Sequence, residues 1–244
     1  MQPSRDDRRL ADLVPTGALH VGLFPSFLYR KKVDGTLDGV AIEIAEVLAA
    51  SIDVKLVPRE YSSPPDVVRA LRTGKCDVAF LGIDPMRAAD VDFTQPYMQA
   101  DFTFLVPDGS PIDAITDADR SGIRIAIVRD HAMDAALRGK LTQAQRVYAP
   151  TPDAAFELLR GGHADVLAGI RPGLLRYVSQ LPGGRVLADR YGANLLAFAV
   201  AKDCPQRLAF VNEFVQRSAI SGLVQRCIEK PACTGSTSFA KAFD

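Results

Sequence analysis

The residues best suited to hold a small ligand follow a short apolar run in the first half of the chain. Residues 78–81 are apolar and end at Gly82, a pattern that predicts a buried strand. Asp84 and Pro85 come next, the pair expected at the N-cap and first position of a helix. Arg87 then falls in the first turn, beside backbone N–H groups that have no partner inside a helix. A guanidinium next to such amides can hold a carboxylate from two sides, whereas the alternative is a surface arginine on a short helix.

Strands and helices alternate around this motif. Apolar runs predict strands at 19–24, 54–57, 78–81, 102–106, 124–128, 146–148, 166–170 and 195–200. Helical spacing and start signals predict helices from about Val40, over 65–72, from about His131, from Pro152, and over 206–229. This alternation is typical of an α/β fold with mostly parallel strand pairing.

The sequence also contains an internal repeat. LRTGKCDV at 71–78 is matched by LRGGHADV at 159–166. A Pro-Asp helix start precedes each copy, and an apolar strand follows it. The repeat indicates two similar α/β lobes, by duplication or by convergence on one turn. In such sheets ligands bind at the carboxyl ends of the strands, which predicts a cleft between the lobes.

The order of residues from 77 to 97 matches a known motif, through Asp77, Gly82, Pro85, Arg87, Asp92-Phe93 and Pro96-Tyr97. The match extends to strand 19–24, the turn at Asp34-Gly35 and the helix near Val40, and covers about 13–226. It resembles family 3 solute-binding proteins, the polar amino-acid receptors of ABC importers. In that family the arginine at the place of Arg87 binds the ligand's α-carboxylate, and a threonine stands where this chain has Asp84.

The resemblance implies a two-lobed type II periplasmic-binding-protein fold, with two α/β lobes joined by two hinge connections. Lobe one is expected to comprise 1–105 and 197–244, and lobe two 106–196, with the ligand cleft between them. Lobe one would offer Arg87, the backbone at Gly82 and Ile83, and Asp84. An aromatic wall is expected from Phe24, Phe27 or Tyr29, which follow the first strand; the alternative for these rings is core packing.

Lobe two departs from the family pattern at two places. Where the family has Gly-Thr-Thr or a near variant at a helix start, this chain has Arg129-Asp130-His131. Arg129 or His131 could replace the usual second anion grip by charge, or both could face solvent. The family's amine-binding aspartate is Ile170 here, followed by Arg171, which would repel an amine and attract a second carboxylate. Asp84 or Asp130 could supply the missing anion.

Composition excludes several other classes of function. The 244 residues carry a formal net charge of zero, which argues against a nucleic-acid partner. No apolar run is long enough to predict a transmembrane segment. No histidine stands at ligand spacing from a cysteine pair, so we expect no metal, and no motif predicts a cofactor. Cys227 and Cys233 could close a small loop in an oxidising compartment or remain thiols.

The leading hypothesis is a non-catalytic binding protein for a small carboxylate-bearing molecule, an amino acid or related organic acid, with ABC importer membrane subunits as possible partners. The rival is an enzyme similar to cyclohexadienyl dehydratases, with Asp84, Asp130 and His131 as available acids or bases. A third alternative is a cytoplasmic ligand-sensing module. The polar stretch 1–9 has no apolar signal core after it. The location is therefore periplasmic if a leader was removed, and cytoplasmic if Met1 is the native start.

Overall fold

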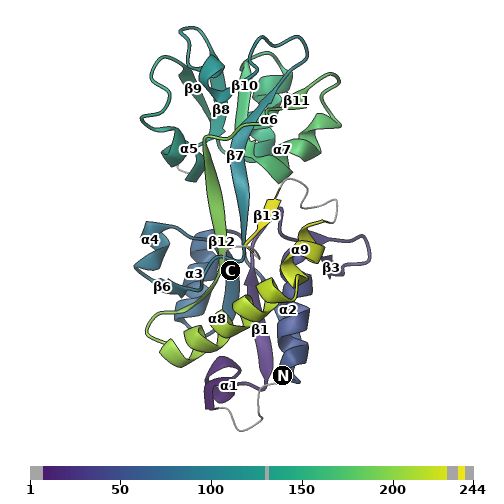
Figure 1. Ribbon diagram of the computed structural model, residues 1–244, viewed down its shortest axis with the longest axis vertical. Coiled ribbons are helices and arrows are strands. Elements are labelled where there is room, and N and C mark those ends of the chain that lie inside the picture. The colour runs from purple at the N-terminus through teal and green to yellow at the C-terminus, as the bar shows by residue number, and fades with distance from the viewer. Residues whose placement is uncertain (1–7, 130–131, 230–235, 240–244) are drawn as a thin grey trace. The chain divides into compact units, whose positions relative to one another are not determined.

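The chain forms two compact α/β units in a computed structural model that describes residues 8–129, 132–229 and 236–239 (Figure 1). Of the described residues, unit 1 contains 8–99, 195–229 and 237–239, and unit 2 contains 100–129, 132–194 and 236. Strands β7 (Met98–Val106) and β12 (Gly192–Ala201) contribute residues to both units. Within the described residues, the chain passes between the units through β7 and β12, and β13 (Ser236–Ser238) also has residues in both.

Unit 1 is built on a sheet whose strand order is β4-β1-β5-β12, with β1 parallel to both β4 and β5, and with β12 antiparallel to β5. Its strands besides β7 and β12 are β1 (Ala18–Leu23), β2 (Arg30–Lys31), β3 (Leu37–Asp38), β4 (Lys55–Glu60), β5 (Val78–Gly82) and β6 (Val91–Phe93). Its described helices are α1 (Arg8–Leu13), α2 (Val40–Ser51), α3 (Pro64–Arg72), α4 (Pro85–Ala88), α8 (Pro205–Ile220) and α9 (Leu223–Ile228). The short strand β13 (Ser236–Ser238) pairs with β7.

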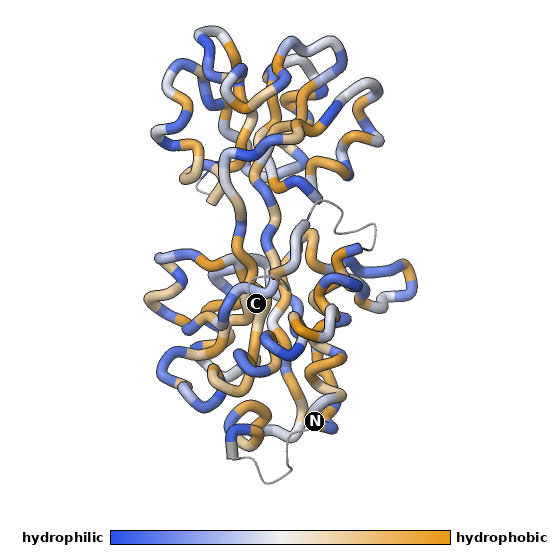
Figure 2. The backbone as a smooth tube through the Cα atoms, in the orientation of Figure 1, coloured by the Kyte–Doolittle hydropathy of each residue, from blue (hydrophilic) through white to orange (hydrophobic). Residues whose placement is uncertain are grey.

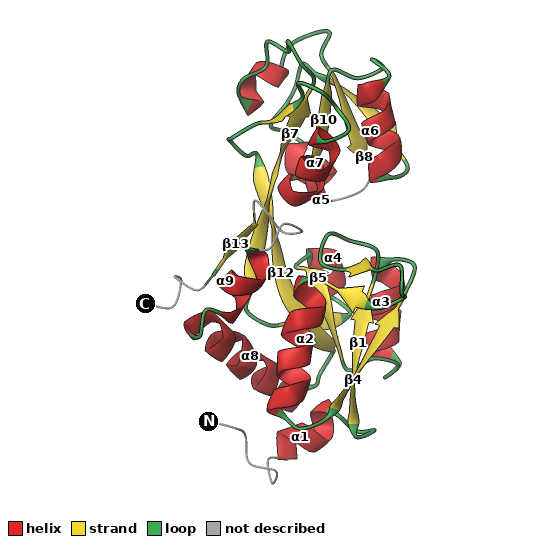
Figure 3. Ribbon diagram, turned by 90° about the vertical axis from the view of Figure 1, so that its right-hand side faces the viewer, coloured by secondary structure: helices red, strands yellow, loops and turns green. Residues whose placement is uncertain are grey.

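Strand β5 is buried on both faces, which explains its unbroken apolar sequence. Leu81 packs with Leu71 of α3 on one face. On the other face the ring of Phe80 lies 4.4 Å from that of Phe198 in β12, and Phe198 contacts Phe214 of α8 edge-on. Figure 3 shows α3 and α8 on opposite sides of these strands. Burial of each such side chain contributes about 1.5–3 kcal/mol, so the end of β5 is held rigidly.

Unit 2 has the strand order β7-β10-β8-β9, with β8 parallel to both β10 and β9, and with β10 antiparallel to β7. Its remaining elements are the 3-10 helix η1 (Ile115–Ala118), β8 (Arg124–Val128), α5 (Ala132–Leu137), β9 (Gln145–Ala149), α6 (Pro152–Arg160), β10 (Val166–Ile170), α7 (Arg171–Val178) and β11 (Arg185–Val186).

Alternate residues of the unit 2 strands face two separate core clusters. Phe104 of β7 and Ile125 of β8 belong to one cluster, whereas Leu105 and Ala126, their neighbours in sequence, belong to the other together with Phe156 of α6. This follows from the two-residue period of a strand. Figure 2 shows hydrophobic and hydrophilic stretches alternating along the chain in each unit.

The repeated sequence motif has the same structure in both units. Asp77 and Asp165 each precede a core strand, β5 or β10. The backbone N–H of Asp77 donates to His20 O at 2.8 Å, and its carboxylate accepts from His20 N at 2.8 Å. Asp165 makes the same two contacts with Arg124, both at 2.8 Å. These aspartates therefore set the start of the neighbouring strand, which explains why the motif recurs.

The observed elements confirm the predicted α/β alternation, with differences at element ends. The predicted strand at 54–57 runs on to Glu60, and the one at 102–106 begins at Met98. The stretch predicted as helical over 206–229 contains two helices, α8 and α9, which are separated because Gly222 adopts a left-handed conformation (φ 68°). Cys233 lies outside the described residues, and with it the proposed bridge to Cys227.

Candidate ligand-binding site

The predicted helix start beside Arg87 is present and well formed. Asp84 is the N-cap of α4, Pro85 occupies the first turn, and the Asp84 Oδ1 atom accepts from the backbone N–H of Met86 at 2.8 Å and of Arg87 at 3.3 Å. Ile83 N donates to Leu195 O of β12 at 2.8 Å. The amides that the sequence suggested for a ligand are therefore already bonded within unit 1. The expected grip by these amides stays a prediction, and here the Asp84 carboxylate accepts from the amides of Met86 and Arg87.

The Arg87 side chain itself has the features of an anion-binding group. It is half-buried, and its Nη1 donates to Gly82 O, the last residue of β5, at 3.0 Å. Burial lowers the pKa of Arg87, and the nearby Asp84 charge opposes that shift. An arginine stays protonated at neutral pH all the same. Within the described parts of the chain, the Gly82 carbonyl is its one hydrogen-bond acceptor and no carboxylate is ion-paired with it.

The aromatic residues expected to form a wall of the site have different environments: Phe24 packs against the core, and Tyr29 makes a polar contact. Phe24 is half-buried and packs against the cluster between α3 and β5, and Phe27 is also half-buried. The Tyr29 hydroxyl donates to Glu60 Oε1 at 3.3 Å, and Lys31 Nζ donates to Glu60 Oε2 at 2.8 Å. Burial, followed by the Glu60 charge, raises the pKa of Tyr29 to about 12. Tyr29 is therefore a neutral hydrogen-bond donor at physiological pH.

Glu60 is a candidate that the sequence reasoning missed. It ends β4, and the parallel register pairs it with Leu23, the residue before Phe24. Because carboxyl ends of parallel strands share one edge, Glu60 lies at the same edge as Phe24 and Gly82. The sequence predicted that this strand ends at residue 57, so Glu60 was not recognised as the residue at its carboxyl end. A polar surface hollow of about 350 Å³ begins here, lined by Glu60, Tyr61, Ser62, Asp66, Arg69, Ala70, Thr73 and Lys75; Arg87 is not part of it.

In unit 2, Arg129 is exposed just beyond the end of β8, the position at which the sequence resemblance implied a second anion grip. Its guanidinium carbon lies 4.0 Å from the centre of the Tyr148 ring. The Tyr148 hydroxyl donates to Asp134 Oδ1 at 3.2 Å, and the fully buried Asp134 carboxylate also accepts from Arg138 at 2.8 Å. Arg129 thus stacks on the Tyr148 ring, and the hydrogen bond to Asp134 holds that ring in place. Asp130 and His131 lie outside the described residues.

Ile170 and Arg171 have structural contacts within unit 2. Ile170 ends β10 and packs against the cluster of Phe104 and Ile125. Arg171 donates to the backbone oxygens of residues 187, 188 and 189 at 2.7, 2.9 and 3.1 Å, and its Nε lies 3.5 Å from Asp101 Oδ2. Its side chain is only 14% exposed. Arg171 therefore binds the loop at 187–189, and this role accounts for its position without a ligand.

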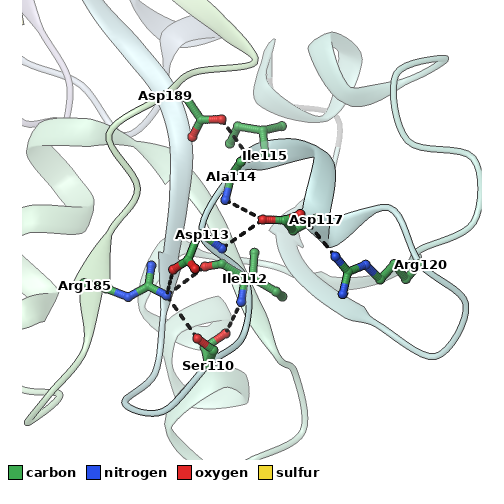
Figure 4. A network of polar contacts seen from close by, with 9 residues as sticks. All are labelled: Ser110, Ile112, Asp113, Ala114, Ile115, Asp117, Arg120, Arg185 and Asp189. Carbon is green, nitrogen blue, oxygen red and sulfur yellow. Dashed lines mark hydrogen bonds and ion pairs between the residues drawn. The ribbon is translucent and has the colours of Figure 1, made fainter.

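The loop after β7 is fixed by a neighbouring network (Figure 4). Arg185 Nη2 donates to Ser110 O at 3.0 Å and to Ile112 O at 2.9 Å. Asp189 Oδ2 accepts from Ile115 N at 2.8 Å, which links this loop to the segment held by Arg171. These contacts join the segment 110–115 to β11 and to the loop at 187–189 within unit 2.

The described residues lack two kinds of feature, a metal-binding cluster and a membrane-spanning helix. No group of three or more His, Cys, Asp or Glu side chains in the described parts of the chain could hold a metal ion. No helix among those residues is long and apolar enough to cross a membrane.

Comparisons with known proteins agree on the family. The model for bacterial extracellular solute-binding proteins, family 3, matches residues 19–230. The ancestral amino acid-binding protein AncCDT-1, a precursor of cyclohexadienyl dehydratase, is 26% identical with a TM-score of 0.74, covering 90% of this chain and 97% of that one. A putative ABC transporter binding component from Wolinella succinogenes, complexed with lysine, has a TM-score of 0.78 at 22% identity, over 88% of this chain and 95% of that one.

A curated relative has a different role. The virulence sensor protein BvgS of Bordetella pertussis is 26% identical over 205 residues, which is 83% of this chain but 15% of the sensor. The chain thus spans only a small part of that relative's length. The family model and the similar solved structures support a ligand-binding role, and most of those structures are binding proteins rather than enzymes. The chain has the type II periplasmic-binding-protein fold and belongs to family 3 of the bacterial extracellular solute-binding proteins.

Proposed function

We propose that this protein binds a small carboxylate-bearing molecule, an amino acid or related organic acid, and that Arg87 is the carboxylate anchor. The observation that carries the proposal is the state of the Arg87 guanidinium. It is half-buried, oriented by Gly82 O at 3.0 Å, and not ion-paired with any carboxylate of the described residues. A desolvated cation without an anionic partner is costly. A ligand carboxylate would offset that cost, with charge-assisted bonds to the remaining N–H groups.

The other residues of the proposed site in unit 1 lie at the carboxyl ends of the strands, the edge of the sheet that Arg87 follows. In unit 1, Phe24, Phe27, Tyr29 and Glu60 follow or end strands of the same sheet. In unit 2, Arg129 stands on the Tyr148 ring as a candidate second anion contact. The proposal is that the ligand lies in a cleft between the lobes, which close on it by bending at the two connecting strands.

We place this binding in the transport of a solute, with the membrane subunits of an ABC importer as partners and the periplasm as the location. Membership of an extracellular solute-binding family supports this assignment. A second candidate is a ligand-sensing domain, which the similarity to a sensor protein favours. Both candidate functions use the same ligand site. They differ in the component that responds to lobe closure, which is the importer's membrane subunits in one case and the rest of a sensor protein in the other.

Native mass spectrometry of gently purified protein tests the binding function. A bound organic acid should appear as a mass increment that is lost on denaturation. Titration calorimetry with that acid, or with a panel of amino acids and organic acids, should then give saturable binding to the full chain. The absence of saturable binding across the panel and of any co-purified acid would refute the proposal.

The enzymatic rival has its own assay. The likeness to a precursor of cyclohexadienyl dehydratase favours a test with prephenate and arogenate, followed by product absorbance. We expect no turnover. Turnover that is lost in Asp84→Asn would identify Asp84 as a catalytic acid and make the protein a lyase.

A further inference from the structure

An apolar patch flanks the Arg87 motif in unit 1. Its members are Ile83, 37% exposed, Met86, 82% exposed, and Leu195, 37% exposed. These are half of the large hydrophobic residues that are exposed in the described parts of the chain; the others are Val33, Val47 and Ile220. Large apolar side chains that gather at one surface position indicate a binding surface more often than isolated ones do.

Backbone contacts place the patch beside Arg87. Ile83 N donates to Leu195 O at 2.8 Å, so Ile83, the residue that follows β5, lies beside Leu195 within β12. Met86 immediately precedes Arg87 in α4, and the Asp84 cap fixes both backbone N–H groups. Leu81, two residues before Ile83, and Leu196, the residue after Leu195, are both buried. Ile83 and Leu195 are therefore exposed next to Gly82, whose carbonyl accepts from the Arg87 guanidinium, and Met86 is exposed next to Arg87 in the sequence.

We infer that the ligand is a monocarboxylic acid with an apolar chain, its carboxylate on Arg87 and its hydrocarbon part on the patch of Ile83, Met86 and Leu195. This inference rests on the proposed function and names the ligand class. The charge of Arg87 selects an acid. The patch selects against a second charge at the far end, because a carboxylate placed on Ile83 and Leu195 would lose water and gain no hydrogen bond there.

A chain-length series tests the inference on the full chain. Acetate, propionate, butyrate and valerate are titrated by calorimetry or by ligand-observed NMR. Each methylene that reaches the patch should tighten binding about fourfold until the patch is covered. Valerate should bind more tightly than glutarate, which adds a second carboxylate at the far end of a chain of the same length. Equal affinity along the series, or a preference for glutarate, would overturn the inference.

A double variant, Ile83→Thr with Leu195→Thr, separates the patch from the anchor. Both positions are partly exposed, and threonine keeps the β-branched or strand-compatible shape. We expect valerate binding to weaken about tenfold or more and acetate binding to stay unchanged. Val47→Thr on α2, an exposed site outside the patch, is the matched control and should change neither affinity.

The outcomes distinguish the inference from the proposed function. If Arg87→Ala abolishes binding of every acid while the double variant changes nothing, the anchor stands and the apolar ligand class is wrong. The patch would then serve another occupant, such as a partner protein. If no acid in the series or the panel binds, the proposed function fails and the inference fails with it.

Discussion

Replacing Arg87 is the sharpest test of how this protein holds its ligand. We consider Arg87→Met, which keeps the length of the side chain and removes its charge. A carboxylate held by a desolvated arginine loses about 2–5 kcal/mol when its partner is removed. At 1.4 kcal/mol per tenfold, the dissociation constant of the ligand should rise by about 30-fold to several thousandfold. Arg87→Lys keeps the charge but loses the planar fork, and should fall between these limits.

The free protein should respond quite differently. Arg87→Met removes one hydrogen bond to Gly82 O, which costs about 1.5–3 kcal/mol for a charged donor. It also removes a half-buried cation that lacks an anionic partner among the described residues, which offsets that cost. The net change in the free energy of unfolding should stay within about 1 kcal/mol. For a chain of this size the melting temperature should then move by no more than about 4 °C.

The assay is calorimetric titration of each variant with the co-purified or best panel ligand, beside thermal unfolding without ligand. Arg160→Ala is the matched control, because Arg160 forms an exposed pair with Glu157 at 2.6 Å on α6, outside the residues proposed for the site. That variant should bind as the original chain does. An Arg87→Met variant that binds normally would remove Arg87 from the site. A variant that unfolds more than about 10 °C lower would show that Arg87 supports the fold instead.

Three further predictions follow from named contacts. Carboxylates without an α-amine should bind more tightly than matched amino acids, for example propionate more tightly than alanine, because Ile170 gives an ammonium group no anionic partner. A preference for alanine that is abolished in Asp84→Asn would instead identify Asp84 as the amine-binding residue. Asparagine is chosen because it can still cap the helix as Asp84 does. Arg171→Leu should lower the free energy of unfolding by about 2–3 kcal/mol, read by urea denaturation, because backbone oxygens at 187–189 lose their donor; an unchanged midpoint would contradict this role. The hydrogen bond from Arg124 lowers the pKa of Asp165 in the folded protein. The ionised Asp165 carboxylate therefore stabilises the fold above its unfolded pKa of about 4, and this stabilisation is lost as the pH falls through the folded pKa. Asp165→Asn should therefore destabilise at pH 7 and lose most of its effect at low pH, and a pH-independent difference would refute the linkage.

Local chemistry was readable from the sequence alone. The cap at Asp84 and Pro85 depends on residues within one turn, and so does the strand that ends at Gly82. The repeat around Asp77 and Asp165 indicated two similar units, because the same short turn leads into a core strand in each. The family resemblance rests on such local motifs, and it correctly indicated the two-lobed fold.

Tertiary structure decided which groups remain available to a ligand. The Asp84 carboxylate accepts hydrogen bonds from the amides that the sequence suggested for a ligand. The guanidinium of Arg171 donates to the carbonyls of the loop at 187–189, which lies sixteen or more residues away in the sequence. Glu60 joins the edge of Phe24 only through strand register. The hydropathy of Ile83 and Leu195 is that of core residues. Their exposure depends on tertiary structure, because β12 continues beyond the end of β5 and the two residues lie side by side there. A sequence specifies each side chain's chemistry, but competition for partners in the folded chain determines which of that chemistry is left for binding.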